Sequence, residues 1–197
     1  MKARKAKIKR TTRETEIAVE LNLDGSGRYQ ISTGIGFLNH MLELFTYHGG
    51  FDLKIKARGD LEVDIHHTNE DLGIAIGQAF NNALQDKKGI SRFGFFYVPM
   101  GKALVRTVLD ISGRPSLHLE KFPRVKSDAS YRLSDLKHFL EGFVRETGIN
   151  LHIDVIKSDD FHHMCEAIFK SLARALRMAI DVNPRYQNKI PSTKGKL

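Results

Sequence analysis

Residues 64–70, Asp-Ile-His-His-Thr-Asn-Glu, recur as residues 160–166, Asp-Phe-His-His-Met-Cys-Glu, and every shared residue is shifted by 96 positions (162 − 66). Each copy opens a stretch whose apolar residues have the spacing of an amphipathic helix. A repeat of this kind indicates that one structural unit occurs twice. The two His-His-x-x-Glu motifs therefore predict a fold made of two similar halves.

The elements that precede the two motifs also repeat. Residues 37–55 align with residues 135–153 at a shift of 98 (138 − 40), which pairs His40 with His138 and Gly50 with Gly148. The change from 98 to 96 requires two extra residues in the first half, and we place them in a predicted hairpin before its motif. We expect a single domain, residues 1–197, with halves at about 1–92 and 93–197.

The local periodicities predict an α+β fold, because helices and strands mix without strict βαβ alternation. Strands are expected at residues 17–23 and 28–32, paired as a hairpin, and at 53–57 and 61–65, paired as a second hairpin. Further strands are expected at 95–98, 104–111, 117–119 and 149–156. Helices are expected at 37–47, from 66 to about 87, at 134–145 and from about 160 to 180, with Asp64 and Asp159 or Asp160 as N-caps.

The net charge of +8 is concentrated at the start of the chain. Residues 1–13 hold seven of the 31 basic residues and no acid, which leaves 24 (31 − 7) against 23 acidic residues in the rest. We expect a solvated first strand with Lys5, Lys7 and Lys9 on its wet face. An arm that binds nucleic acid or a membrane surface is the alternative.

Composition is typical of a globular protein, with 41% hydrophobic and 27% charged residues. Cys165 is the single cysteine, so no intramolecular disulfide can form, and no stretch approaches the roughly 18 consecutive apolar residues of a membrane span. We expect a cytoplasmic protein with no membrane partner.

The spacing of the motif suits metal ions. On a helix the first His and the Glu lie about 40° apart and can share one ion, whereas the second His lies about 100° from the first. Two motifs could thus build two sites, each with a His and Glu of one motif and the second His of the other. We expect fourth ligands from His40 and His152, and a structural role for His138.

Imidazole and carboxylate ligands without thiolate suit Mn²⁺, Fe²⁺, Co²⁺ or Zn²⁺, and affinity alone favours zinc over manganese. Cys165 corresponds to Asn69 in the other copy, so we expect it to pack on its helix rather than bind metal.

Motifs between residues 34 and 195 carry a resemblance to a known family, and the resemblance itself runs from Arg10 to Gly195. The motifs are residues 34–42 (GIGFLNHML), 48–52 (HGGFD), 66–71 (HHTNED), 112–115 (SGRP), 151–153 (LHI), His162 and His163 with Glu166, and 191–195 (PSTKG). On these residues the chain resembles the imidazole glycerol phosphate dehydratases of histidine biosynthesis. The resemblance implies that each half is a four-stranded sheet with two helices on one face, and that the helices lie between the two sheets, as in domain 2 of ribosomal protein S5.

The resemblance also implies a site. It has two manganese ions per active site, with other divalent metals possible, bound by His40, His66, His67, Glu70, His152, His162, His163 and Glu166. The substrate is a small phosphorylated imidazole, bound by Glu14, His40, His48, His66, Glu70, Arg92, Arg114, His162, Lys170, Ser192, Thr193 and Lys194. The catalytic residues are Glu14, His66, Glu70, His162 and Glu166. The implied assembly is a homo-oligomer of about 24 subunits, built from trimers, with active sites at subunit interfaces.

The implied reaction removes water from the glycerol chain of imidazole glycerol phosphate and gives imidazole acetol phosphate. Glu14 is the candidate base at carbon, and the Arg and Lys cluster would anchor the phosphate. The chain departs from the family pattern at Asn39 and Ile65, where Asp is usual, so the affinity for metal could differ.

Two rival functions stay open on the residues alone. Paired ions with phosphate-binding cations also suit a two-metal phosphatase. A binding module is the other rival, in which the basic arm holds nucleic acid and the metals only join subunits. The ligand set favours the dehydratase, with no nucleic-acid partner.

Overall fold

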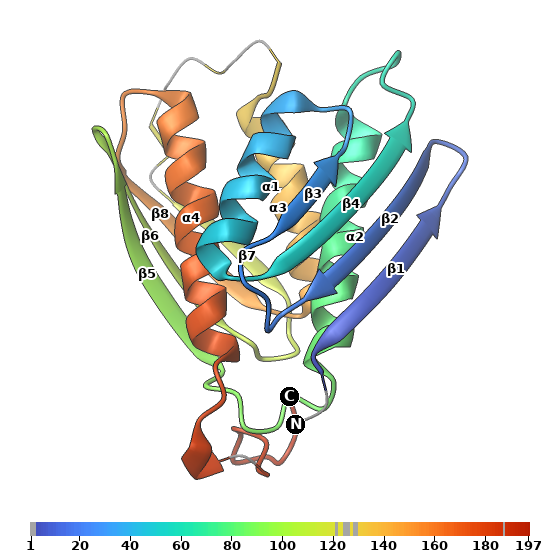
Figure 1. Ribbon diagram of the computed structural model, residues 1–197. Coiled ribbons are helices and arrows are strands. Elements are labelled where there is room, and N and C mark those ends of the chain that lie inside the picture. The colour runs from blue at the N-terminus through green and yellow to red at the C-terminus, as the bar shows by residue number, and fades with distance from the viewer. Residues whose placement is uncertain (1–2, 121, 124–126, 128–129, 187) are drawn as a thin grey trace.

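The computed structural model describes residues 3–120, 122–123, 127, 130–186 and 188–197. In these residues two four-stranded sheets face each other with four α-helices between them (Figure 1). The first half comprises β1 (Lys5–Thr11), β2 (Thr15–Asn22), β3 (Tyr29–Ser32), α1 (Gly36–Gly49), β4 (Asp52–Gly59) and α2 (His66–Leu84). The second half comprises β5 (Phe93–Met100), β6 (Ala103–Asp110), β7 (Ser116–Glu120), α3 (Leu133–Thr147), β8 (Asn150–Lys157) and α4 (Phe161–Ile180), with a short 3-10 helix (Pro184–Tyr186) after it.

The two halves share one topology, which confirms the predicted duplication and the α+β class. The strand orders are β1-β2-β4-β3 and β5-β6-β8-β7. In each sheet the first two pairings are antiparallel and the last, β3 with β4 or β7 with β8, is parallel. The division near residue 92 stays a prediction.

The alternation of buried and exposed side chains along the strands explains why the helices lie between the two sheets. Ile17, Val19 and Leu21 of β2 are buried, whereas their neighbours in the strand point outward. The inner face of each sheet is apolar in the same way, since alternate residues of β6 and β8 are also buried, and burying a large aliphatic side chain contributes about 1.5–3 kcal/mol. The helices cover both apolar faces at once. Lys5, Lys7 and Lys9 are exposed on β1, as predicted for a solvated first strand.

The ends of the helices follow the repeat. α1 and α3 stop at Gly50 and Gly148, which have φ values of 66° and 69° and so occupy the left-handed region that glycine tolerates. At the start of α4, the Asp160 side chain accepts a hydrogen bond from the His163 amide, which confirms it as the N-cap. In α2 the Asp64 carboxylate accepts from the His66 amide, one residue before the N-cap position at Ile65.

Two predicted pairings are wrong. β3 pairs with β4 in parallel rather than with β2, because β2 already has β1 on one edge and β4 on the other. The Asp52 carboxylate accepts from the Ser26 and Arg28 amides, which holds the connecting loop beside β4.

Residues 61–65 form no strand, so the second hairpin is also wrong. β4 lies between β2 and β3 and has no free edge for them. The chain turns instead, with the Val63 amide donating to the Asp60 carbonyl at 2.9 Å, and Val63 is exposed. The two extra residues of the first half lie in this turn rather than in a hairpin.

Helices α2 and α3 cross with their backbones in close contact. A Cβ atom added to Gly73 would overlap the Phe139 carbonyl oxygen, and one added to Gly77 would lie 2.7 Å from the Phe143 carbonyl oxygen. From the other helix, a Cβ at Gly142 would lie 3.0 Å from the Glu70 carbonyl oxygen. This contact holds α3 against the His-His-x-x-Glu motif of α2.

In the described part of the chain, no helix combines the length and the apolar character that crossing a membrane requires.

We predict that Gly73→Ala destabilises the protein. Alanine favours a helix by about 1 kcal/mol, but here the added methyl group meets a backbone that can move only if the helices separate. The expected net loss in the free energy of unfolding is about 1–3 kcal/mol, measured by urea titration at one fixed protein concentration. Gly36→Ala is the matched control, since its Cβ would meet no atom within 4 Å. Equal stability of the two variants would contradict a tight α2–α3 contact.

Candidate functional site

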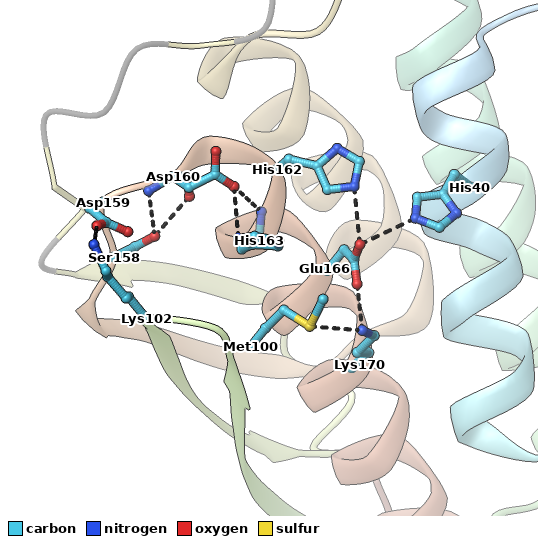
Figure 2. A network of polar contacts seen from close by, with 10 residues as sticks. All are labelled: His40, Met100, Lys102, Ser158, Asp159, Asp160, His162, His163, Glu166 and Lys170. Atoms are coloured by element: carbon cyan, nitrogen blue, oxygen red, sulfur yellow. Dashed lines mark hydrogen bonds and ion pairs between the residues drawn. The ribbon is translucent and has the colours of Figure 1, made fainter.

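His40, His162 and Glu166 form a compact set where α1 meets the start of α4 (Figure 2). The His162 Nε2 and His40 Nε2 atoms lie 3.0 and 3.4 Å from the same oxygen, Glu166 Oε1. One ligand atom from each of the three residues lies within 4.8 Å of the others. Within the part of the chain that the structure describes, no other three His, Cys, Asp or Glu residues meet this condition.

Glu166 is held in its ionised form. Burial raises the pKa of its carboxyl group, but hydrogen bonds from Lys170, His40 and His162 outweigh burial and lower the pKa below its usual value. The Lys170 ammonium lies 2.5 Å from Glu166 Oε2 and 3.4 Å from the Met100 sulfur. A carboxylate that stays charged while nearly buried, beside two imidazoles, suits a divalent cation.

The second histidine of this motif points away from the set, as helical geometry predicts. His163 Nδ1 lies 3.2 Å from Asp160 Oδ1, on the side of α4 that faces away from His40 (Figure 2). Gly101, in the β5–β6 turn, lies next to this ring.

The first half repeats the arrangement more loosely. His66 Nε2 lies 3.6 Å from Glu70 Oε2, and the His138 ring meets the His66 ring edge-on at 4.6 Å between centroids. Among the residues that the structure describes, His138 Nδ1 is buried and has no hydrogen-bond partner. The Arg145 guanidinium lies 3.6 Å from Glu70 and provides the nearby positive charge.

His138, for which a structural role was predicted, lies where the duplication would place a counterpart of His40. The shift of 98 pairs it with His40, and the structure places the two alike, each beside the first His of a motif. That pairing was the available signal. A buried imidazole nitrogen without a partner fits a missing ligand better than a purely structural role.

His67, the second histidine of the first motif, faces the β1–β2 turn. Its Nδ1 atom lies 2.9 Å from Asp60 Oδ2, and its Nε2 atom lies 3.8 Å from Glu14 Oε1. The hydrogen bond to Asp60 raises the pKa of His67, and Glu14 and Asp64 add to this effect.

One of the two departures from the family pattern has a local role in the fold. The Asn39 side-chain oxygen accepts from the Thr33 amide at 3.0 Å and from the Thr33 hydroxyl at 2.7 Å, so it closes the turn before α1. Ile65 is the residue at the N-cap position of α2 and makes no side-chain cap.

The expected phosphate-binding residues lie at the other end of the molecule. The Arg92 amide donates to the Ala179 carbonyl, in the last turn of α4. Seventeen residues separate Ala179 from His162, a distance of about 25 Å along the helix. The Arg92 guanidinium bonds Asp110 at 2.7 and 3.0 Å and the Pro191 carbonyl at 2.9 Å, so it joins the sheet to the C-terminal tail.

Other expected site residues are near Arg92 rather than near the motifs. The tail carries Ser192, Thr193 and Lys194, and its end at Leu197 lies against Gly113, next to the exposed Arg114. His152 lies on the outer face of β8, stacked on His118 at 4.2 Å between centroids. Within one chain, therefore, neither His-His-x-x-Glu motif has His152, Arg92, Arg114 or the tail beside it.

His48, the remaining expected substrate contact, is in the last turn of α1. Burial, and then the positive charges of Lys170 and Arg174, lowers the pKa of His48. Its imidazole is therefore neutral at pH 7 and can accept or donate a hydrogen bond.

Comparison with known proteins gives a consistent result. A sequence model of the imidazoleglycerol-phosphate dehydratase family matches residues 33–176. Relatives with that name include a protein from Thermoanaerobacter pseudethanolicus, 52% identical over 194 residues and covering 98% of this chain and 100% of the relative. Another, from Prochlorococcus marinus, is 51% identical over 197 residues, and the match covers 98% of this chain and 96% of the relative.

Solved structures agree with the fold. The crystal structure of imidazoleglycerol-phosphate dehydratase from Staphylococcus aureus has a TM-score of 0.82 at 37% identity, covering 91% of this chain and 99% of that one. The structure of IGPD from Pyrococcus furiosus in complex with (S)-C348 has a TM-score of 0.82 at 35% identity, covering 96% and 100%.

We predict that Asp60→Asn lowers the pKa of His67 in metal-free protein, because the hydrogen bond that raises it loses its charge. A raised folded-state pKa stabilises the fold below about pH 6.5, the unfolded value, and this contribution is lost as the pH rises through the folded pKa. Titration of labelled histidine rings by NMR measures the change, with His118 as the internal reference. An unchanged His67 titration would show that Asp60 is not its main partner.

Proposed function

We propose, on the premise that the chain belongs to the imidazoleglycerol-phosphate dehydratase family, that it dehydrates its substrate with two manganese ions in active sites shared between subunits. Family membership makes the chain a hydro-lyase of histidine biosynthesis, acting on imidazole glycerol phosphate. The metals, the assembly and the roles of individual residues belong to the proposal.

One observation carries the metal proposal, namely the cluster of His40, His162 and Glu166. We assign these three to one ion and His66, Glu70 and His138 to the other, because the duplication relates the two sets. His67 and His163 point away from their own sets, so we assign each to the ion of another motif. His152 stays a predicted ligand, and it could reach a metal only in the site of a second copy.

The donors fit a metal such as manganese. They are imidazoles and carboxylates, which suit Mn²⁺ among the first-row ions. Cys165 lies on the buried side of α4, and burial raises the pKa of its thiol, so no thiolate is available to favour a softer ion. When bound, the ions would supply Lewis-acid activation of the imidazole ring and of the departing hydroxide.

The side chains of this protein would remove the proton and bind the substrate. Glu14 is the proposed base that removes the proton from carbon, since its half-exposed carboxylate lies beside His67. Arg92, Arg114, Lys170 and the tail residues Ser192, Thr193 and Lys194 would hold the substrate, chiefly its phosphate. His48 would add a neutral hydrogen-bond partner for the substrate. Glu70 and Glu166 would give each metal site a negatively charged ligand.

The separation of these residues supports shared active sites. A small substrate cannot span about 25 Å from the motif end of one chain to its Arg92 end. If both ends contact one substrate, they come from different subunits, and such a heterologous contact closes into a ring or shell. A cubic assembly of about 24 subunits built from trimers is the arrangement we propose.

An exposed apolar face supports self-association. The outer side of the second sheet presents Phe93, Phe95, Val108 and Ile156, each at least 40% exposed, and His152 lies on the same face. Large apolar side chains that are exposed together on one sheet face commonly mark an interface.

The proposal includes no nucleic-acid partner and a cytoplasmic location. The basic arm is β1, whose Lys7 and Lys9 lie 2.8 and 3.5 Å from Glu20 and Glu16 of β2. Partnered charges on a sheet suit a solvated surface better than a nucleic-acid site.

We predict that chelator-stripped protein forms no imidazole acetol phosphate and that added Mn²⁺ restores turnover. The measurement is product formation from imidazole glycerol phosphate, with inorganic phosphate followed in the same samples. Phosphate release without dehydration would instead indicate the two-metal phosphatase. Full turnover by protein that metal analysis shows to be metal-free would contradict the metal proposal.

We also predict that two inactive variants restore each other. Glu166→Gln removes a metal ligand and Arg114→Ala removes an anion contact at the opposite end. In co-expressed mixed particles, some sites combine the intact end of each variant, so activity should return to at most about a quarter of the wild-type value. The separately expressed variants, mixed after assembly, are the control. No gain upon co-expression would mean that each site lies within one chain.

A further inference from the structure

A chain of hydrogen bonds links α2 to the turn that carries Glu14. Asp71, the residue after Glu70, is only 7% exposed, and both of its carboxylate oxygens have partners. Oδ1 accepts from the Arg10 guanidinium at 2.9 and 2.8 Å, and Oδ2 accepts from the Thr15 hydroxyl at 2.5 Å. Thr15 is 4% exposed, so this contact is shielded from water.

The direction of each bond in the chain is determined. An ionised carboxylate only accepts, so the Thr15 hydroxyl proton points to Asp71. The Thr12 hydroxyl, 3.2 Å from that of Thr15, must then donate to it. The Thr12 oxygen in turn accepts from the Glu14 amide at 3.1 Å and from the Thr15 amide at 3.0 Å. Every hydroxyl is satisfied in only one arrangement, which makes the turn rigid.

Glu14 is thereby fixed through its backbone while its side chain stays free. Its amide is bound by Thr12, and its carbonyl accepts from the Asp60 amide at 3.1 Å. Its carboxylate is about half exposed and lies 3.8 Å from His67. The side chain can therefore meet a substrate at a set position beside the second histidine of the motif.

In the described part of the second half no such chain occurs, so the fold itself does not require it. The position that corresponds to Asp71 is Ala167 (71 + 96), and it is buried without a polar group. The β5–β6 turn places Gly101 next to His163, where the first half places Glu14 next to His67. The polar chain occurs only where the turn carries a carboxylate.

We propose that Thr15 and Asp71 are positioning residues for Glu14, holding its carboxylate against the metal-binding end of α2 through the Thr12 turn. This inference rests on the proposed function, in which Glu14 is the base. A base displaced by about 1 Å can lose about a hundredfold in rate, so the effect should fall on kcat.

Thr15→Val tests the proposal in the full-length, manganese-loaded protein, because it removes the hydroxyl at nearly constant volume. We expect kcat to fall about 10- to 100-fold, with KM and manganese content unchanged. Thr15→Ser keeps the hydroxyl and should restore most of the rate. Thr107→Val is the matched control, since Thr107 is also fully buried and its hydroxyl bonds Ser171 at 2.7 Å, far from Glu14 in the other half. Its kcat should match the wild type. Equal kcat losses in Thr15→Val and Thr107→Val would overturn the proposal.

A double-mutant cycle separates positioning from general damage. In a Glu14→Gln background, Thr15→Val should cause no further loss of kcat, because the group it positions is already gone. A further loss as large as in the wild-type background would overturn the proposal. If Glu14→Gln loses turnover while Thr15→Val does not, only this inference fails. If Glu14→Gln retains the wild-type rate, the base role itself fails, whatever Thr15→Val does.

Discussion

An α-helix advances about 100° with each residue, and the placement of every candidate ligand depends on that rotation. It puts the first His and the Glu of each motif on one face, seen as 3.0 Å between His162 and Glu166. It turns the second His toward a hairpin, where His67 meets Asp60 and Glu14. The start of each helix thus presents candidate ligands on two sides. On one side, the first His and the Glu lie beside a histidine of a neighbouring helix, His40 or His138. On the other side, the second His points toward the surface.

Much of this architecture could be predicted from the sequence, because periodicity and repetition are local signals. The helices, most strands and the two-halved fold follow from them, whereas His40, His162 and Glu166 were each predicted as ligands without all three being assigned to one ion. Strand partners could not be predicted, because whether β2 or β4 has a free edge depends on the whole sheet. For the same reason residues 61–65, which alternate like a strand, form a turn. His138, predicted to be structural, lies beside His66, which is 72 positions away (138 − 66), and this proximity depends on how α2 and α3 pack. The separation of Arg92 from the motifs depends on the path of α4 through the fold.

The duplicated halves keep the same ligand geometry but surround it differently. Glu166 has Lys170 one turn further along its own helix, whereas the corresponding residue after Glu70 is the apolar Ile74, and the cation comes from Arg145 of α3. Asp71 is matched by Ala167, and Glu14 by a glycine turn. The two His-and-Glu sets therefore have different charged neighbours, although the duplication relates them.

The edge strands β1 and β5, which occupy equivalent positions in the two sheets, differ in what they expose to other chains. β1 carries Lys5, Lys7, Lys9 and Arg10, and charged edge strands resist pairing with another strand. β5 carries no charge over its eight residues, FGFFYVPM, and Phe93, Phe95 and Tyr97 are 57%, 54% and 47% exposed. Uncharged aromatic segments at a sheet edge are prone to aggregate, and Pro99 is the single interruption near its end. β5 is thus the strand of the second sheet most prone to pair with another chain, whereas the charges on β1 protect the equivalent edge of the first sheet.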